Sequence, residues 1–281
     1  MKIIKHLQEM QKIALAAKRE GKRIGLVPTM GYFHEGHLSL MRIARENANL
    51  VVVSNFVNPT QFAPTEDLNR YPRDFERDCR MAETIPVDIM FAPPKEEMYP
   101  EGYRTYVEVE DWGKVLCGAT RPTHFRGVTT IVLKLFNIVQ PDVAVFGWKD
   151  AQQFLILRRM VEDLNLPIEM IGGETVREES GLAMSSRNKY LTPERKAEAV
   201  VLSRSLFEAR RRIQEEGETN AAALQQFIRS EIEKAQGARL DYVEVVSMKT
   251  LEKIPEIKKG DTLIALAVFF GNTRLIDNTR Y

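Results

Sequence analysis

The sequence predicts an α/β fold in which a Rossmann-like, doubly wound parallel sheet is followed by a smaller α+β domain. Through about the first 175 residues short apolar runs alternate with helical patterns, whereas later two charge-rich helices precede strands that have no helices between them. Strand–helix alternation is typical of parallel sheets with crossover helices, and segregated helices and strands are typical of α+β domains. We expect a first domain at residues 1–176 and a second at 177–281, joined in a stretch rich in Gly, Ser and charge.

Apolar runs and helical periodicity define the elements of both domains. Strands of the first domain are expected at residues 24–27, 50–54, 87–91, 143–146 and 168–171, and helices at 38–48, 128–138 and 151–164. The run at 50–54 is rich in β-branched residues, as in strands that are buried on both faces. In the second domain helices are expected at 193–216 and 221–235, and antiparallel strands at 240–246, 262–270 and 273–276.

Composition excludes several classes of protein. The 281 residues carry 40 Lys+Arg and 39 Asp+Glu, so the net charge of +1 gives no basic field for nucleic acid. Cys79 and Cys117 lie far apart without a C-x-x-C spacing, which argues against a disulfide framework and a cysteine zinc site. The N-terminus has no apolar signal region and no run of 18 apolar residues occurs. We expect a soluble, cytoplasmic protein that has no membrane partner.

The sharpest local motif is Pro28–His37, which follows the strand at 24–27 and opens the next helix. In an open α/β sheet the ligand crevice lies at the carboxyl ends of the strands. Gly31 and Gly36 permit close backbone approach, and a helix N-terminus offers N–H groups to phosphate. His34 and His37 are three residues apart and can point the same way, so they could donate to a leaving pyrophosphate.

Two other interpretations of these histidines are open. A single histidine is more often a structural hydrogen-bonding group than a catalyst. A zinc site is the other alternative, but the sequence lacks H-E-x-x-H, and His6 and His124 are the two further histidines that could complete such a site.

Two further motifs carry groups that suit a nucleotide. Gly147-Trp148-Lys149-Asp150 follows the strand at 143–146, at the same edge of the sheet, and offers a lysine charge and a helix-capping carboxylate. Met184-Ser185-Ser186-Arg187-Asn188 lies between the domains and offers two hydroxyls and a guanidinium. Taken alone, the first motif could be an ordinary surface helix start and the second an ordinary polar loop.

Together the three motifs resemble the HIGH-motif nucleotidyltransferases, which are related to class I aminoacyl-tRNA synthetases. Within that superfamily the chain is similar to the pantoate–β-alanine ligases (pantothenate synthetases). The stretches that carry the resemblance span the whole chain in the family's order and spacing, and they are 28–37, 56–62, 121–128, 147–153, 176–178, 181–188 and 271–278.

The resemblance implies an ATP-dependent ligase that condenses pantoate with β-alanine to pantothenate through a pantoyl-adenylate, releasing pyrophosphate and AMP. It implies catalytic roles for His37, His34, Lys149 and Arg187, and Gln61 and Gln153 as the pantoate-binding amides. Neutral amides suit pantoate because they can donate to and accept from its two hydroxyls. The ATP site would be lined by Met30, Gly31, His34, Gly36, His37, Gly147, Trp148, Lys149, Asp150, Val176, Met184, Ser185, Ser186 and Arg187.

The resemblance also implies a homodimer. Mg²⁺ is expected to bridge ATP oxygens, and because an acyl-adenylate is labile we expect a lid that excludes water, for which the Ser185–Arg187 loop and the second domain are the candidates. The metal ligands are left unassigned, because magnesium on ATP is held largely by phosphates and water. Three residues depart from the family's pattern: Trp148 stands where a polar residue is usual, Phe33 where Leu is, and Asn55 where an apolar residue is. They leave the charged and amide groups intact but affect local packing.

Three rival functions share part of this pattern. A plain nucleotidylyltransferase would have the histidine motif but would keep the nucleotide in its product. A tRNA-charging enzyme would need an anticodon-binding domain or a basic surface, neither of which the sequence indicates. A non-catalytic nucleotide-binding protein would bind ATP and release no pyrophosphate.

Overall fold

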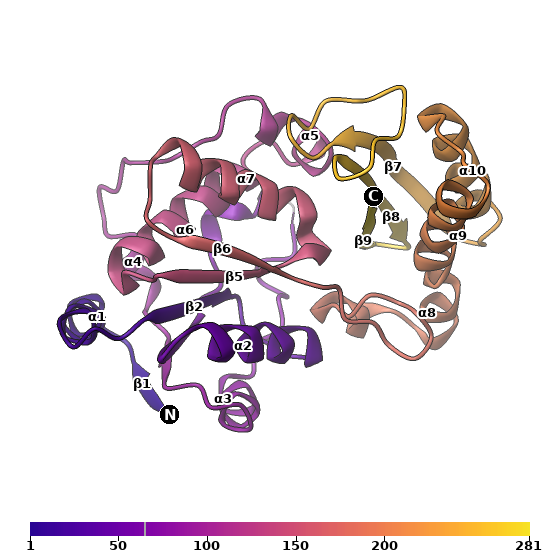
Figure 1. Cartoon of the computed structure of the whole chain (residues 1–281). Coiled ribbons are helices and arrows are strands. Elements are labelled where there is room, and N and C mark those ends of the chain that lie inside the picture. The colour runs from indigo at the N-terminus through magenta and orange to yellow at the C-terminus, as the bar shows by residue number, and fades with distance from the viewer. Residues whose placement is uncertain (65) are drawn as a thin grey trace. The chain divides into compact units, whose positions relative to one another are not determined.

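The chain folds into two compact units in a computed structural model that describes residues 1–64 and 66–281. The first unit comprises residues 1–114, 118–148 and 153–174, and the second comprises 115–117, 149–152 and 175–281. The division into an ATP- and pantoate-binding domain at residues 1–176 and a lid domain at 177–281 stays a prediction. Figure 1 labels the elements of each unit.

The first unit is built on a six-stranded, wholly parallel sheet. In spatial order its strands are β1 (Lys2–Ile4), β4 (Ile89–Phe91), β3 (Leu50–Asn55), β2 (Ile24–Thr29), β5 (Val143–Gly147) and β6 (Glu169–Gly173). All five expected strands are present, although β4 begins two residues later than the run at 87–91 predicts. The sheet confirms the predicted fold class.

Helices cover both faces of this sheet. Figure 1 shows α2 (Glu35–Asn47) and α3 (Phe75–Glu83) on one face, and α6 (His124–Val139) and α7 (Ala151–Asp163) on the other. Because successive strand residues point to opposite faces, Val51 and Val53 join the core beneath α2 while Val52 faces the other way, and all three are fully buried. The remaining elements of the unit are α1 (Leu7–Arg19), η1 (Pro59–Gln61), α4 (Lys95–Met98) and η2 (Trp112–Lys114). Two short elements are shared between the units: α5 (Cys117–Thr120) belongs to the first from residue 118 on, and η3 (Trp148–Asp150) belongs to it at Trp148 alone.

The strand order reverses between β2 and β5. The chain runs from β2 to its neighbour β3 and on to β4, and later returns to place β5 on the opposite side of β2. In doubly wound sheets the ligand crevice opens at this reversal, outside the carboxyl ends of the strands. The histidine motif leaves β2 there and Gly147 ends β5, so the topology brings the two predicted motif starts to one point.

Asp142 joins the amino ends of β2 and β5, at the edge of the sheet opposite to the motifs. Its Oδ2 accepts a hydrogen bond of 2.7 Å from the Ile24 amide, and its Oδ1 accepts one from the Lys18 ammonium. Burial by itself raises the pKa of the Asp142 carboxyl, but the Lys18 ammonium and the Ile24 amide outweigh that effect and hold the pKa below its ordinary value of 3.8.

Asp142→Asn should therefore lower the free energy of unfolding in a pH-dependent way. A carboxyl whose pKa is lower in the folded state contributes stability that is fully present above its unfolded pKa and is lost as the pH falls through the folded pKa. Urea unfolding at neutral pH should show the variant less stable by about 1 kcal/mol, and the gap should shrink at about pH 3. Asp163→Asn, which alters an exposed pair with Arg159, is the control and should show little gap at either pH. A gap for Asp142→Asn that is equally large at about pH 3 would contradict the assignment.

The second unit is a three-stranded antiparallel sheet with helices, as predicted. Its strands, in the order β7-β8-β9, are Ala238–Ser247, Thr262–Phe270 and Thr273–Arg280. Its helices are η4 (Ser186–Tyr190), α8 (Pro193–Ala199), α9 (Val201–Glu215) and α10 (Ala221–Glu233). The single helix expected at 193–216 is divided at Val200, because the Val200 amide bonds to the Ala197 carbonyl three residues back and tightens the turn.

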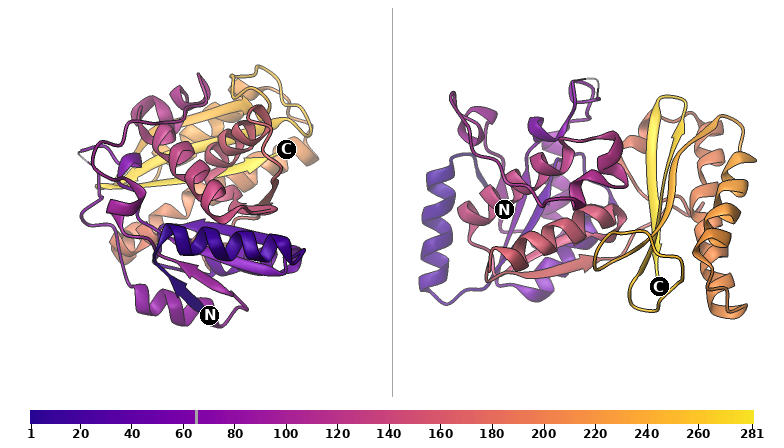
Figure 2. Two further views of the ribbon diagram at one scale, coloured as in Figure 1. Left: turned by 90° about the vertical axis from the view of Figure 1, so that its left-hand side faces the viewer. Right: turned by 90° about the horizontal axis from the view of Figure 1, so that it is seen from above.

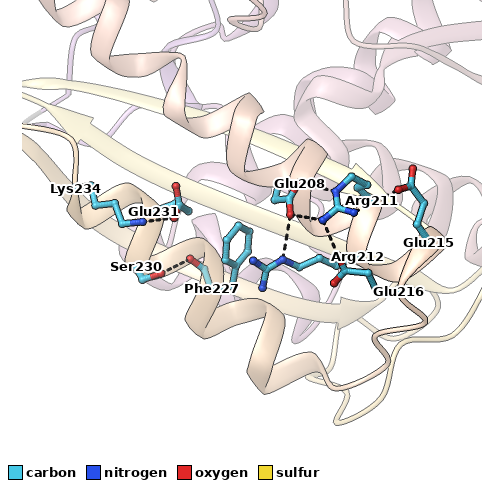
Figure 3. A network of polar contacts seen from close by, with 9 residues as sticks. All are labelled: Glu208, Arg211, Arg212, Glu215, Glu216, Phe227, Ser230, Glu231 and Lys234. Atoms are coloured by element: carbon cyan, nitrogen blue, oxygen red, sulfur yellow. Dashed lines mark hydrogen bonds and ion pairs between the residues drawn. The ribbon is translucent and has the colours of Figure 1, made fainter.

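Helices α9 and α10 lie side by side against this sheet (Figure 2). Their buried faces form one apolar core with β7 and β8, which includes Leu206 on α9, Ile228 on α10 and Leu266 on β8. The outer face of α9 is charged: Figure 3 shows Arg211 between Glu208, Glu215 and Glu216, while the Arg212 guanidinium lies 3.6 Å from the ring centre of Phe227 on α10. Such exposed pairs contribute little stability individually, so the apolar core holds the unit together. Among the described residues of the chain, no helix combines the length and apolar character needed to cross a membrane.

Candidate functional site

The turn that leaves β2 has an unusual backbone. Gly31 has φ +82° and Tyr32 has φ +54°, both in the left-handed region. A Cβ on Gly31 would lie 2.6 Å from the Asn55 Oδ1, at the end of the neighbouring strand β3. Glycine is therefore required at position 31 both for the backbone conformation and for the space.

Gly31→Ala should destabilise the first unit measurably. The left-handed backbone costs a non-glycine residue about 1–2 kcal/mol, and the clash with Asn55 should raise the total to about 2–4 kcal/mol. Gly102→Ala is a matched control, because Gly102 has φ +80° but nothing lies within 4 Å of its Cβ position. Urea unfolding of the two variants separates the cost of the left-handed backbone from the cost of the clash with Asn55. Equal losses in the free energy of unfolding would show that the Asn55 contact does not restrict position 31.

The two histidines of the motif close the first turn of α2. The His34 Nδ1 accepts the Gly36 amide at 3.2 Å, and the His37 Nδ1 accepts the His34 amide at 3.2 Å. This reciprocal arrangement is a capping box, in which two of the amides that a helix start leaves without helical partners are bound by side chains. Both histidines therefore have a structural role as caps of α2, and these hydrogen bonds also fix the orientation of their rings.

Capping also fixes the tautomer of both rings. A nitrogen that accepts an amide N–H carries no proton of its own, so each neutral imidazole holds its proton on Nε2. The two ring centroids lie 4.1 Å apart. The turn thus presents two neighbouring Nε2–H donors at the start of a helix whose dipole also favours anions.

The predicted pantoate amide Gln61 lies in the same unit as this turn. Its side-chain Nε2 lies 3.2 Å from the Met30 Sδ, and its Oε1 accepts the Asn58 Nδ2 at 3.0 Å. Asn58 also donates to the Gly127 carbonyl on α6 at 3.1 Å, and the Gln61 carbonyl lies 2.9 Å from the His124 Nδ1. Met30 and Gln61, assigned separately from the sequence, are therefore neighbours, and α6 holds Gln61 in place.

Asn58 is a buried residue to which sequence reasoning assigned no role. It is 1% exposed, and its Oδ1 accepts the Tyr99 hydroxyl at 2.8 Å and the Thr60 hydroxyl at 3.0 Å. The signal that could have identified it is an amide between an apolar strand end and a proline, a position at which side chains commonly cap turns.

Gly147 ends β5, and the residue after it departs from the family's pattern. The Trp148 ring lies 4.3 Å from that of Phe154, centroid to centroid, and a Cβ on Gly172 of β6 would lie 2.2 Å from the Trp148 Nε1. The indole thus fits where the neighbouring strand has no side chain, which explains how this position accommodates it. Gln153 is half-buried in the first turn of α7.

The remaining predicted residues belong to the second unit. There the Met184 amide donates to the Val176 carbonyl at 3.0 Å, and the Ser185 hydroxyl caps η4 by accepting the Arg187 amide at 3.3 Å. The Lys149 Nζ lies 3.9 Å from the Asp150 Oδ2, while its carbonyl accepts the Asn278 amide group at 3.0 Å. Val176 and the loop 184–187 are thus brought together, whereas their approach to the histidines stays a prediction.

A buried ion pair supports the loop 184–187. Arg177 donates through NH1 and NH2 to the two carboxylate oxygens of Asp277 on β9, at 2.7 and 2.9 Å, and the Asp277 side chain is 1% exposed. NH1 also donates to the Gly181 carbonyl, and the Asn188 Nδ2 donates to Glu178 and to the Ala183 carbonyl. Sequence reasoning quoted Arg177 and Asp277 within motifs but assigned them no role, because 100 residues separate them.

No metal cage is evident in the part of the chain that the structure describes. No group of three or more His, Cys, Asp or Glu side chains there is arranged to hold a metal ion.

Comparison with known proteins points to one family. A profile of pantoate–β-alanine ligase matches residues 2–280. The pantothenate synthetase of Acetivibrio thermocellus is 56% identical over 278 residues, which cover 99% of this chain and 98% of that protein. The solved pantothenate synthetase of Thermus thermophilus is similar in fold, with a TM-score of 0.93 and 45% identity over 100% of this chain and 99% of that one.

A second solved relative carries ligands. The pantoate–β-alanine ligase of Francisella tularensis, complexed with beta-gamma ATP and β-alanine, has a TM-score of 0.80 and 32% identity, covering 100% of this chain and 97% of that one. The similarity therefore extends over both units.

Proposed function

The chain belongs to the pantoate–β-alanine ligase family and is an enzyme that joins pantoate to β-alanine, and we propose that it does so with ATP through a pantoyl-adenylate. In the first step a pantoate carboxylate oxygen bonds to the α-phosphorus of ATP and pyrophosphate leaves. In the second the β-alanine amine attacks the acyl carbon, loses a proton, and AMP leaves with the bridging oxygen.

The paired Nε2–H groups of His34 and His37 are the observation that best supports this proposal. Negative charge grows on the leaving pyrophosphate, and donors already aimed at that charge need no reorganisation when the reaction occurs. Because capping holds both Nδ1 atoms as acceptors, the proton of each neutral ring is on Nε2, which is the atom that we propose donates to the phosphates. We assign His37 as the proton donor to the leaving group and His34 as a second phosphate donor.

Other residues would bind the triphosphate and the nucleoside. We propose that Lys149 and Arg187 neutralise the phosphates, since nucleotidyl transfer depends mainly on positioning and on charge stabilisation. The remaining ATP contacts are proposed for Met30, Gly31, Gly36, Gly147, Trp148, Asp150, Val176, Met184, Ser185 and Ser186.

Gln61 and Gln153 are proposed to orient pantoate. Gln61 is 7% exposed and held by Asn58, so its amide is fixed in advance. A buried amide that binds a hydroxyl rejects an analogue lacking it, by ~10⁴-fold in favourable cases.

Mg²⁺ is proposed to enter with ATP. Phosphate oxygens and water are its preferred ligands in nucleotide sites, and the described residues offer no cage of their own. Bound there, the ion would neutralise phosphate charge.

Three further features are proposed: a closing domain, a homodimer and a cytoplasmic location. Residues 177–281 would act as a closing domain that protects the labile adenylate from water, which hydrogen exchange with and without ATP tests through protection of the loop 184–187. The enzyme would be a homodimer, which light scattering tests, and would act in the cytoplasm.

Isotope transfer tests the adenylate. Pantoate labelled with ¹⁸O in its carboxylate should pass one label to the phosphate of AMP, and pyrophosphate should appear before β-alanine is added. Label in inorganic phosphate together with ADP would indicate an acyl phosphate instead. A product that retains the nucleotide would favour a plain nucleotidylyltransferase.

A further inference from the structure

A buried carboxylate on α3 holds the turn that carries the two histidines. The Asp78 Oδ2 accepts the Tyr32 amide at 2.7 Å, and the Asp78 Oδ1 accepts the Phe33 amide at 2.7 Å. These are the two residues before His34, so the carboxylate fixes the backbone that leads directly into the capping box.

Arg77, the residue before Asp78 on α3, also contacts Tyr32 and Phe33. The Arg77 NH1 donates to the Phe33 carbonyl at 3.0 Å, and its guanidinium lies 5.2 Å from the centre of the Tyr32 ring. Phe33 is thus bound at both its N–H and its C=O, and its ring is buried at 1% exposure. The entry to α2 is restrained by side chains that lie more than 40 residues further along the chain.

Asn55 connects this carboxylate to the sheet. Its Nδ2 donates to the Asp78 Oδ2 at 2.9 Å, and its Oδ1 lies 2.6 Å from the position that a Cβ on residue 31 would take. The amide at the end of β3 therefore contacts Asp78 and also limits position 31, at which the backbone turns toward the histidines.

Such an arrangement is costly unless it is fully bonded. Asp78 is 1% exposed, and burial raises the pKa of its carboxyl, while the Phe33, Tyr32 and Asn55 donors oppose that rise. A buried carboxylate with three donors is a rigid anchor, because loss of any partner leaves a buried polar group unsatisfied.

We propose that Asp78, braced by Asn55, is a positioning residue that sets the direction of the His34 and His37 Nε2–H groups toward the phosphates. The inference rests on the proposed function of these histidines. Asp78 touches no reacting atom in this assignment, and it acts through the backbone of residues 32 and 33.

Asp78→Asn is the decisive variant. It keeps the shape of the side chain but turns one acceptor into a donor that faces an amide N–H. Pyrophosphate release should show kcat lower by about 10²-fold with the KM for ATP changed by less than about threefold, because misplacement by about 1 Å has this effect on catalysis. Asp74→Asn removes a carboxylate from the same helix but keeps the cap on the Arg77 amide, and it should match wild type.

Nitrogen NMR of the histidine rings separates positioning from stability. Wild type should show His34 and His37 with Nδ1 as acceptor and the proton on Nε2, and Asp78→Asn should shift both signals while Asp74→Asn leaves them unchanged. A folded Asp78→Asn enzyme whose kcat stays within about twofold of that of Asp74→Asn, or whose ring signals do not move, would overturn the proposal.

Asn55→Val provides the same test should Asp78→Asn fail to fold. It removes the brace but leaves both Asp78 bonds to the backbone, so kcat should fall by about tenfold and the same two signals should shift. Wild-type kcat and ring signals in this variant would refute the role of the brace. If instead wild type released no pyrophosphate, the proposed function would fail, and the ring signals would still report on the Asp78 contact.

Discussion

His37→Gln should slow pyrophosphate release by about 10²–10⁴-fold while leaving α2 folded. Glutamine at this position of a capping box reaches back to the N-cap amide, so it can replace the bond that the His37 Nδ1 makes to the His34 amide. It cannot replace the imidazole proton donor at the same place. The substitution therefore separates the structural function of the residue from its catalytic one.

Two matched variants sharpen this test. His34→Asn introduces a favourable N-cap residue in place of the other ring and should also lose activity without losing helix stability. His6→Gln alters an exposed histidine paired with Glu97 and should leave pyrophosphate release unchanged. Single-turnover pyrophosphate release and thermal unfolding measure the two properties. An active His37→Gln enzyme would remove this residue from the chemistry.

Lys149→Ala should reduce the rate of adenylate formation by about 10²–10⁴-fold, comparable with the loss of other groups that stabilise charge on transferring phosphates. The Lys149 side chain is 21% exposed, and its ammonium is 3.9 Å from the Asp150 carboxylate, too far for a hydrogen bond. A phosphate oxygen within hydrogen-bond distance of the ammonium would therefore interact with it more strongly than this carboxylate does.

A surface lysine provides the comparison for Lys149. Lys114, at the end of η2, is 62% exposed and pairs with Asp111 just ahead of that element, so Lys114→Ala removes one positive charge without affecting the site. Its rate should equal that of wild type. Should Lys149→Ala release pyrophosphate as fast as Lys114→Ala, the phosphate-binding role would be wrong.

The elements that the sequence predicted are those whose signal is local. The β-branched run at Leu50–Asn55 and the Gly/His turn after β2 each combine a short pattern with a strong physical consequence. The patterns considered did not predict α1, although Met10, Ala14 and Ala17 form its buried stripe at helical spacing. Three small or flexible apolar residues among charged ones give a weak periodic signal.

The residues that hold the site residues in place could not be predicted from local patterns. Asp78 is one of three acidic residues in the charge-rich helix α3, and its burial and its contacts with Tyr32, Phe33 and Asn55 distinguish it. The Asn58 and Arg177 contacts likewise join residues 69 and 100 positions apart. Sequence motifs identify groups that suit the reaction, whereas the residues that hold those groups are defined by tertiary packing.

The Arg177–Asp277 pair has a consequence for the order in which the protein matures. Asp277 lies on β9, the final strand of its sheet, and its partner lies just ahead of the loop 184–187. On the ribosome the loop emerges well before β9 does. Arg177 therefore lacks its partner Asp277 until nearly all of the second unit has been synthesised. The nucleotide binding that we propose for this loop should therefore be acquired late and abruptly, when β9 joins the sheet.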